Sequence, residues 1–217
     1  MEYKLATSTW DDKEIRAIQS VIESDMYSMG TMVTKFEKDF ADFFGSRYAV
    51  MCSSGSTANL LMVAALFYTK NPNLKRGDEI IVPTVSWSTT YFPLQQYGLK
   101  LKFVDIDLNT LNYNLTELEK AISEDTKAIM VVNLLGNSND FDQVFKIIHN
   151  KNIIIIEDNC ESMGSKYNKK YTGTFGLMGT FSSFFSHHIA TMEGGVVVTD
   201  NEELYHVLLC LRAHGWT

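Results

Sequence analysis

Seven short apolar runs, separated by longer segments with helical patterning, constrain the fold of this chain more than any other feature. Most of the runs are continuously hydrophobic, which is typical of strands buried on both faces of a sheet. They cover residues 48–53, 79–83, 101–106, 128–133, 152–158, 180–186 and 195–200. The alternation predicts an α/β fold, in which a mostly parallel seven-stranded sheet lies between two layers of helices in a three-layer α/β/α domain.

The segments between the runs carry helix signals. We expect helices within 56–69, 114–123, 138–150 and 201–213, and two of them begin near Asn or Ser with acids in the first turn. Before the first run, residues 11–24 and 31–44 read as two amphipathic helices. The pattern predicts an N-terminal helical segment, residues 1–44, that packs on a large domain formed by residues 45–217.

Length, composition and charge exclude several classes of protein. The chain has 217 residues and 45% hydrophobic content, enough for one large domain or two small ones. Its formal charge is −7 and its Lys and Arg residues are scattered, so we expect no nucleic-acid partner.

Targeting signals and cysteines point to a soluble cytoplasmic protein with no membrane partner. The first residues lack a signal-peptide pattern, and the longest apolar run, residues 60–68, is about half of what a membrane-spanning helix needs. Cys52, Cys160 and Cys210 are far apart and lack CxxC spacing. They predict neither a disulfide framework nor a zinc site, and read as small buried apolar residues.

Ligands of parallel α/β sheets bind beyond the carboxyl ends of the strands, so the residues that follow each run are the candidate site. After the first run, the small-residue turn 53–59, SSGSTAN, leads into a helix whose free N–H groups suit an anion such as phosphate, although an ordinary strand-to-helix turn reads the same way. Trp87 follows the second run. It either stacks on a flat ring or belongs to the core.

Acids follow the fifth run. The sequence IIIIEDNCES predicts that Glu157, Asp158 and Glu161 reach the same rim of the sheet. Asp158 suits a salt link to a protonated ring nitrogen, and a structural cap or turn is the alternative.

Two adjacent histidines follow the sixth run, in TFSSFFSHHIATMEGG. Ser182 offers a hydroxyl, and His187 and His188 offer nitrogens that titrate near neutral pH. A metal hydrolase using both histidines and Glu193 is one alternative. Adjacent histidines on a strand point to opposite faces, however, so they would make poor joint ligands and we predict no metal site.

The order of these motifs resembles the large domain of fold-type-I pyridoxal phosphate (PLP) enzymes, and more narrowly the DegT/DnrJ/EryC1/StrS sugar aminotransferase superfamily. Members carry Ser-Phe-x-x-x-Lys followed, six residues after the lysine, by Glu-Gly-Gly. Laid on this chain, the pattern places the serine at Ser182, the glutamate at Glu193 and the lysine at His187. The chain therefore departs from the family at the residue that holds the cofactor covalently.

The resemblance assigns further roles and a reaction. Imidazole has no primary amine, so His187 would serve as the catalytic base, as in a branch of the family that uses pyridoxamine phosphate (PMP) to remove the C3 hydroxyl of a nucleotide-linked 4-keto-6-deoxysugar. L-Glutamate would regenerate PMP, and His188 would face away from the cofactor. The implied cofactor contacts are Asp158 with the ring nitrogen, Trp87 with the ring face, Glu161 near the ring hydroxyl, and Gly55, Ser56 and Ser182 with the phosphate.

The family comparison leaves other possibilities open. The resemblance implies a homodimer and a second, smaller C-terminal domain, for which we expect no counterpart within residues 1–217. A related 3-dehydrase coupled to an iron–sulfur cluster needs four cysteines, and the three here are not suitably spaced. A sugar aminotransferase, or an inactive truncated member of the family, are the remaining alternatives.

Overall fold

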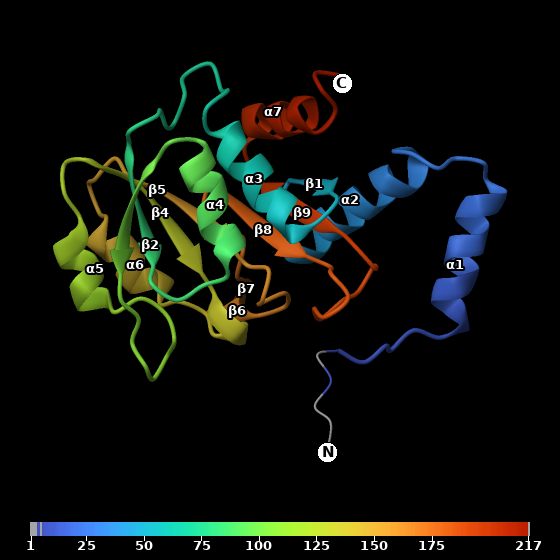
Figure 1. Ribbon diagram of the computed structural model, residues 1–217, viewed down its shortest axis with the longest axis horizontal. Helices are drawn as coiled ribbons and strands as arrows, with labels where there is room; N and C mark the ends of the chain where they lie inside the picture. The colour runs from blue at the N-terminus through green and yellow to red at the C-terminus, as the bar shows by residue number, and fades with distance from the viewer. Residues whose placement is uncertain (1–3, 5, 217) are drawn as a thin grey trace.

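The computed structural model describes residue 4 and residues 6–216, and it places a twisted sheet between helical layers (Figure 1). The sheet has seven strands in the order β1-β9-β8-β5-β4-β2-β3. Their bounds are β1 Tyr48–Cys52, β2 Glu79–Pro83, β3 Lys100–Val104, β4 Thr126–Val132, β5 Ile154–Asp158, β8 Met178–Ser182 and β9 Gly195–Thr199. The α/β fold with its mostly parallel sheet is confirmed.

Among the strands of this sheet that the described residues form, β9 alone runs against its neighbours. It pairs antiparallel with both β1 and β8, whereas β8, β5, β4, β2 and β3 pair in parallel. In the central pair, Val132 of β4 lies opposite Asp158 of β5, and Asp158 lies opposite Thr180 of β8. The carboxyl ends of these strands therefore meet at one edge of the sheet.

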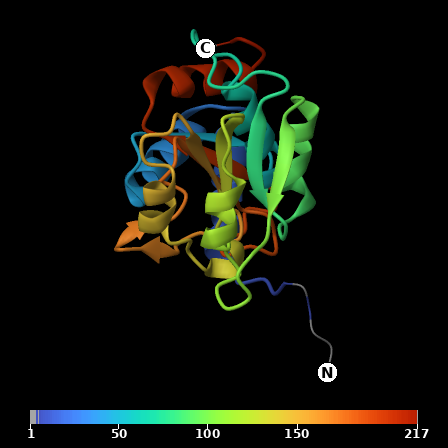
Figure 2. The ribbon, with the colours of Figure 1, turned by 90° about the vertical axis from the view of Figure 1, so that its left-hand side faces the viewer.

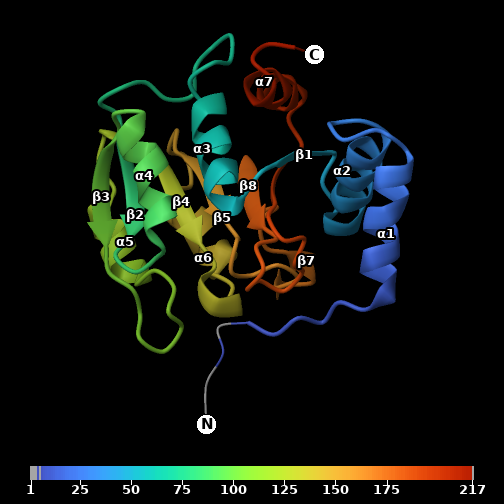
Figure 3. The same ribbon diagram turned by 45° about the vertical axis from the view of Figure 1, so that its right-hand side comes forward.

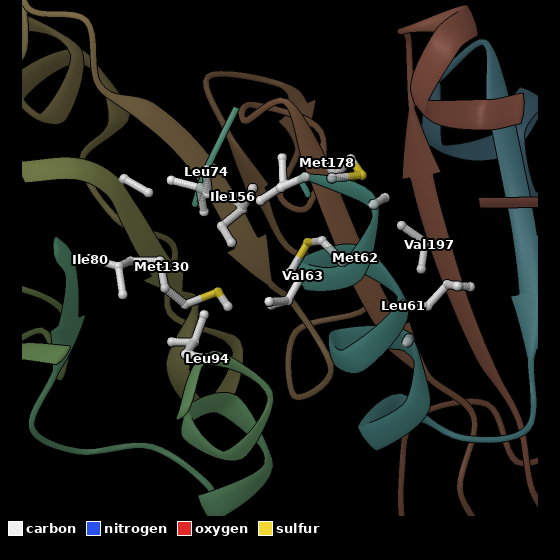
Figure 4. Close-up of a cluster of buried hydrophobic side chains, with 14 of the residues drawn as sticks. Leu61, Met62, Val63, Leu74, Ile80, Leu94, Met130, Ile156, Met178 and Val197 are labelled. Atoms are coloured by element: carbon white, nitrogen blue, oxygen red, sulfur yellow. The ribbon is translucent and has the colours of Figure 1, made fainter. Parts of the chain in front are cut away.

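Helices cover both faces of the sheet (Figures 1 and 2). Helices α3 (Gly55–Ala65), α4 (Ser88–Gln96) and α7 (Glu202–Arg212) share a core with one face. Met62 of α3, Met130 of β4 and Ile156 of β5 are fully buried in it (Figure 4). Helices α5 (Leu115–Ala121) and α6 (Phe141–Ile147) pack on the other face around Leu118 and Phe141.

The two N-terminal helices differ in how they meet the sheet. Helix α2 (Thr31–Phe44) buries Ala41 and Phe44 against Phe181 and its neighbours. Helix α1 (Asp12–Glu23) lies to one side of the rest of the chain (Figures 1 and 3). None of its residues is buried in the part of the chain that the structure describes. The division at residue 44 stays a prediction.

Some elements were not predicted. Helix α4 contains Pro93, a residue that normally interrupts helices, and its sequence STTYFPLQQ lacks a helical apolar period. A short hairpin joins β6 (Lys166–Tyr167) to β7 (Lys170–Tyr171), and a 3-10 turn, η1, covers Leu134–Gly136. Among the described residues, no helix combines the length and the apolar character needed to cross a membrane.

The sixth strand is shorter than the sequence indicated. Strand β8 ends at Ser182, so residues 183–194 form a loop that includes both histidines. The loop is closed by a bond from the Ser183 N–H to the Gly194 carbonyl, 2.9 Å. The indole N–H of Trp10 donates to the Ala190 carbonyl of the loop, 3.1 Å.

Candidate active site

A cavity of about 830 Å³ opens at the carboxyl ends of β5 and β8 and brings the predicted site residues together. Its lining includes all seven of them: Gly55, Ser56, Trp87, Asp158, Glu161, Ser182 and His187. This is the edge at which parallel sheets bind ligands. The cavity is therefore our candidate active site, and the role of each residue in it stays a prediction.

One corner of the cavity is formed by the first turn of α3. Ser54 caps the helix, and its hydroxyl accepts the N–H of Thr57, 3.1 Å. The N–H groups of Gly55 and Ser56 lie in that first turn, where the helix supplies no acceptor. A side chain at Gly55 would place its Cβ 2.6 Å from the Cβ of Ser182. Glycine is therefore required for the Ser182 hydroxyl to lie beside the helix start.

Asp158 forms the floor of the cavity at the end of β5. It is only 6% exposed. Its Oδ2 accepts the amide of Asn59 at 2.8 Å and the hydroxyl of Thr90 at 2.7 Å, and its Oδ1 accepts the Cys160 N–H at 3.2 Å. These bonds fix a carboxylate that still borders the cavity.

Trp87 lies at the mouth of the cavity, just before α4. Its side chain is 69% exposed, so the reading of Trp87 as a core residue is wrong. The indole is free to stack on a flat ligand.

His187 reaches the cavity from the loop after β8, where its N–H donates to the Phe184 carbonyl, 2.9 Å. Burial and the neighbouring His188 lower the pKa of His187 from 6.5, and Asp158 opposes them only in part. Its imidazole is therefore mainly neutral at pH 7 and able to accept a proton.

His188 also lines the cavity, and its direction relative to the cofactor stays a prediction. Both histidines lie on a loop and not on a strand, so the alternation of strand side chains, used above against a joint metal site, does not apply to them. Within the described residues, no group of His, Cys, Asp and Glu side chains is arranged to hold a metal ion.

The three acids predicted at one rim separate into two environments. Glu161 lines the cavity and accepts the Leu135 N–H at 3.3 Å; burial and, to a smaller extent, Asp158 raise its pKa. Glu157 does not line the cavity. It is fully buried and accepts the N–H groups of Gly173, Phe175 and Gly176. Neighbouring strand residues point to opposite faces, so Glu157 and Asp158 could not share a rim.

Sequence reasoning missed several residues of the site. Asn59 and Thr90 hold Asp158, and Cys160, predicted to be simply buried, borders the cavity. Burial raises the pKa of the Cys160 thiol well above its usual value, so it is not a reactive thiolate. Asn59 lies one helical turn after Gly55, on the same face of α3, and that spacing could have identified it.

A family model provides the first comparison with known proteins. The model for the DegT/DnrJ/EryC1/StrS aminotransferase family matches residues 8–217. The chain belongs to this family.

The similar relatives of this family member include a 3-dehydratase. A GDP-4-keto-6-deoxy-D-mannose 3-dehydratase of Yersinia pseudotuberculosis is 69% identical to it over 217 residues, which are 100% of this chain and 55% of the relative. The chain spans about half the length of the curated relatives it matches.

Two crystal structures of GDP-4-keto-6-deoxymannose-3-dehydratase share its fold. In one, a variant with asparagine in place of a histidine binds GDP-perosamine; the other holds a trapped PLP-glutamate geminal diamine. Each is 68% identical to this chain, with a TM-score of 0.98, and the match covers 100% of this chain and 56% of the solved one.

Proposed function

We propose that this chain forms the PLP-binding part of a PMP-dependent 3-dehydratase that acts on a nucleotide-linked 4-keto-6-deoxysugar. The nucleotide sugar is GDP-4-keto-6-deoxy-D-mannose, and the product serves O-antigen synthesis as a precursor of colitose. The observation that carries the proposal is His187, a neutral imidazole in the cavity at the place where aminotransferases of the family carry lysine. The 3-dehydratase among the similar relatives supports the same substrate.

The residues around the cavity fit the cofactor. The first turn of α3 offers free N–H groups and a positive dipole end for the phosphate, and the Ser182 hydroxyl lies beside it. Asp158 offers a carboxylate for the ring nitrogen, and exposed Trp87 offers a flat face. Glu161 is placed nearby to contact the ring hydroxyl.

When bound, PMP supplies the amine that joins the sugar ketone and a ring that takes up electrons. His187 would remove a proton from the C4′ carbon of the cofactor, and its lowered pKa leaves it unprotonated for this role. The electron pair left behind would expel the C3 hydroxyl, and the protonated imidazole would give its proton to that hydroxyl, which leaves as water. A lysine would return the proton to the sugar and produce an aminosugar.

Hydrolysis would then release the 4-keto-3,6-dideoxysugar and ammonia and leave the cofactor as PLP, and L-glutamate is the proposed amino donor that would convert it back to PMP. We also propose a cytoplasmic homodimer. The three free cysteines suit a reducing compartment, and the exposed Ile15, Ile18 and Ile22 of α1 form an apolar stripe that a second copy could cover. Sedimentation velocity gives the molar mass, and a monomer at micromolar concentration would contradict the dimer.

The decisive assay incubates the purified chain with PLP, L-glutamate and GDP-4-keto-6-deoxy-D-mannose, and weighs the sugar product by mass spectrometry. Loss of one oxygen atom is the expected result. Conversion of the ketone to an amine would identify a sugar aminotransferase instead. An unaltered sugar would mean that residues 1–217 do not suffice for turnover, as in the inactive alternative.

His187→Lys tests the position of the base directly. The new amine is expected to bond the cofactor covalently, so borohydride reduction should leave a pyridoxyl phosphate group on the protein, detected by its mass. The matched control is His188→Lys, which adds an amine one residue away. Labelling of the control alone would show that His188, and not His187, occupies the lysine position.

A further inference from the structure

The Asp158 carboxylate is held by two side chains to which nothing above assigns a role in the reaction. Asn59 of α3 and Thr90 of α4 both donate to the same oxygen, Oδ2, at 2.8 and 2.7 Å. Asn59 is 1% exposed and Thr90 is completely buried. Their polar groups therefore have no access to bulk water, and a lost partner could not be replaced without cost.

The amide of Asn59 can adopt only one orientation. Its Nδ2 faces two acceptors, Asp158 Oδ2 and the Thr89 carbonyl at 3.3 Å, whereas its Oδ1 accepts the Thr180 hydroxyl at 2.6 Å. A flipped amide would place its oxygen against the carboxylate, and both would lose a donor. Strand β8, through Thr180, thus helps to set the direction of the Asn59 donor.

The hydroxyl of Thr90 is equally constrained. It has one proton, and an ionised carboxylate can only accept, so Thr90 donates to Asp158. The Ser86 hydroxyl, 2.7 Å from Thr90 Oγ1, must then donate to Thr90. This chain of donors connects Ser86 at the cavity lining to the buried Oδ2 of Asp158.

We propose that Asn59 and Thr90 are positioning residues that saturate Oδ2 of Asp158 and thereby leave Oδ1 as the oxygen that meets the pyridine nitrogen. The inference rests on the proposed function, because it assumes that a PLP-type ring enters the cavity. Oδ1 has one bond, from the Cys160 N–H at 3.2 Å, and retains acceptor capacity. Because Oδ2 accepts two bonds and Oδ1 accepts one long bond, Oδ1 is the better acceptor for a further donor.

The test removes one donor without changing the volume of the side chain. Thr90→Val deletes the hydroxyl, Thr90→Ser restores it, and Asp158→Asn is the comparator that removes the charge. The matched control is Thr84→Val, which deletes an exposed threonine hydroxyl bound to Asp105 at 2.9 Å and lying outside the cavity lining. Circular dichroism melts establish that each variant is folded. Should Thr90→Val not fold, Thr90→Cys keeps a similar volume with a much weaker donor.

Two readouts address different steps. In the chain without cofactor, the ¹³Cγ resonance of Asp158 reports its hydrogen bonding; Thr90→Val should move it, and Thr84→Val should not. With PLP added, equilibrium dialysis gives the Kd and the absorbance of bound PLP against pH reports protonation of its ring. Thr90→Val should weaken binding roughly tenfold and should move the ring titration to lower pH, because a carboxylate with one donor fewer on Oδ2 is held less firmly against the ring nitrogen. Thr90→Ser should recover both.

The outcomes separate the two claims. If the unmodified chain does not bind PLP, the proposed function fails, and the resonance of Asp158 still decides whether Thr90 positions it. If the unmodified chain binds PLP and Asp158→Asn weakens binding, but Thr90→Val leaves the Kd, the ring titration and the Asp158 resonance unaltered, the positioning role is wrong and the proposed function stands.

Discussion

Glu157 and Asp158, neighbouring acids at the end of β5, lie on opposite faces of the sheet and in different surroundings. Glu157 points into a closed environment, where three backbone N–H groups and the Asn133 amide surround its carboxylate. Asp158, the next residue, has two side-chain donors on one oxygen and a cavity beside it. The carboxylate of Glu157 bonds only to groups of the folded chain among the described residues, whereas the carboxylate of Asp158 can still accept a bond from a ligand. Sequence proximity therefore gives no guide to shared function along a strand.

We expect the free energy of unfolding to depend more on Glu157 than on Asp158. Glu157→Leu leaves the N–H groups of Gly173, Phe175 and Gly176 buried without an acceptor, and each such loss costs about 1–3 kcal/mol. We expect the free energy of unfolding to fall by about 5 kcal/mol, measured by urea titration. Glu157→Gln, which keeps one acceptor oxygen, should lose less. Equal losses for both variants would contradict the backbone-anchoring role.

A change at Asp158 should lower turnover and leave the stability of the fold nearly unchanged. Asp158→Asn is isosteric and keeps an acceptor, so the unfolding free energy should stay within about 1 kcal/mol of the unmodified chain. Turnover in the sugar assay should fall on the order of a hundredfold, because the ring loses its charged partner. Glu157→Gln is the reference for a neutralised acid outside the cavity. Unchanged turnover in Asp158→Asn would overturn its pairing with the ring nitrogen.

A smaller effect is expected at the mouth of the cavity. Trp87 is 69% exposed, so Trp87→Ala should leave the melting temperature nearly unaltered. The lost stacking should weaken PLP binding by roughly fivefold, corresponding to about 1 kcal/mol. Trp216→Ala is the matched control, because Trp216 is 81% exposed and lies outside the cavity lining. Equal Kd values for the two variants would exclude stacking on Trp87.

The smallest effect concerns the pH response of the histidine loop. The pKa of His187 lies below 6.5 because of burial and the nearby His188, so His188→Gln should raise the His187 pKa toward 6.5, followed by NMR of the imidazole. Folding favours neutral His187. Its contribution to stability is present above pH 6.5 and is lost as the pH falls through that value toward the folded pKa. Relative to His187→Gln, the unmodified chain should therefore lose stability in this range.

Much of the site was predictable because its residues follow strands. Buried parallel strands read as continuous apolar runs, and their carboxyl ends converge, so Gly55, Asp158, Ser182 and His187 could be placed together from spacing and family resemblance. The end of β8 was harder to predict from the sequence. Phe184 and Phe185 extend the apolar run, but the chain leaves the sheet at Ser182, and the loop that follows contributes both histidines to the cavity lining.

By itself, the sequence determined the layer architecture and the candidate base, because apolar periodicity and a histidine at a lysine position are local features. The sequence already indicated Asp158 as the acid for the ring nitrogen, but the tertiary structure decided that Glu157 lies outside the cavity lining and which side chains hold Asp158. Asn59 and Asp158 are 99 residues apart, and Thr90 and Asp158 are 68 apart. The spacing from Gly55 could place Asn59 on the cavity face of α3, but its bond to Asp158, and that of Thr90, depend on how α3 and α4 pack over the sheet, which no local pattern encodes.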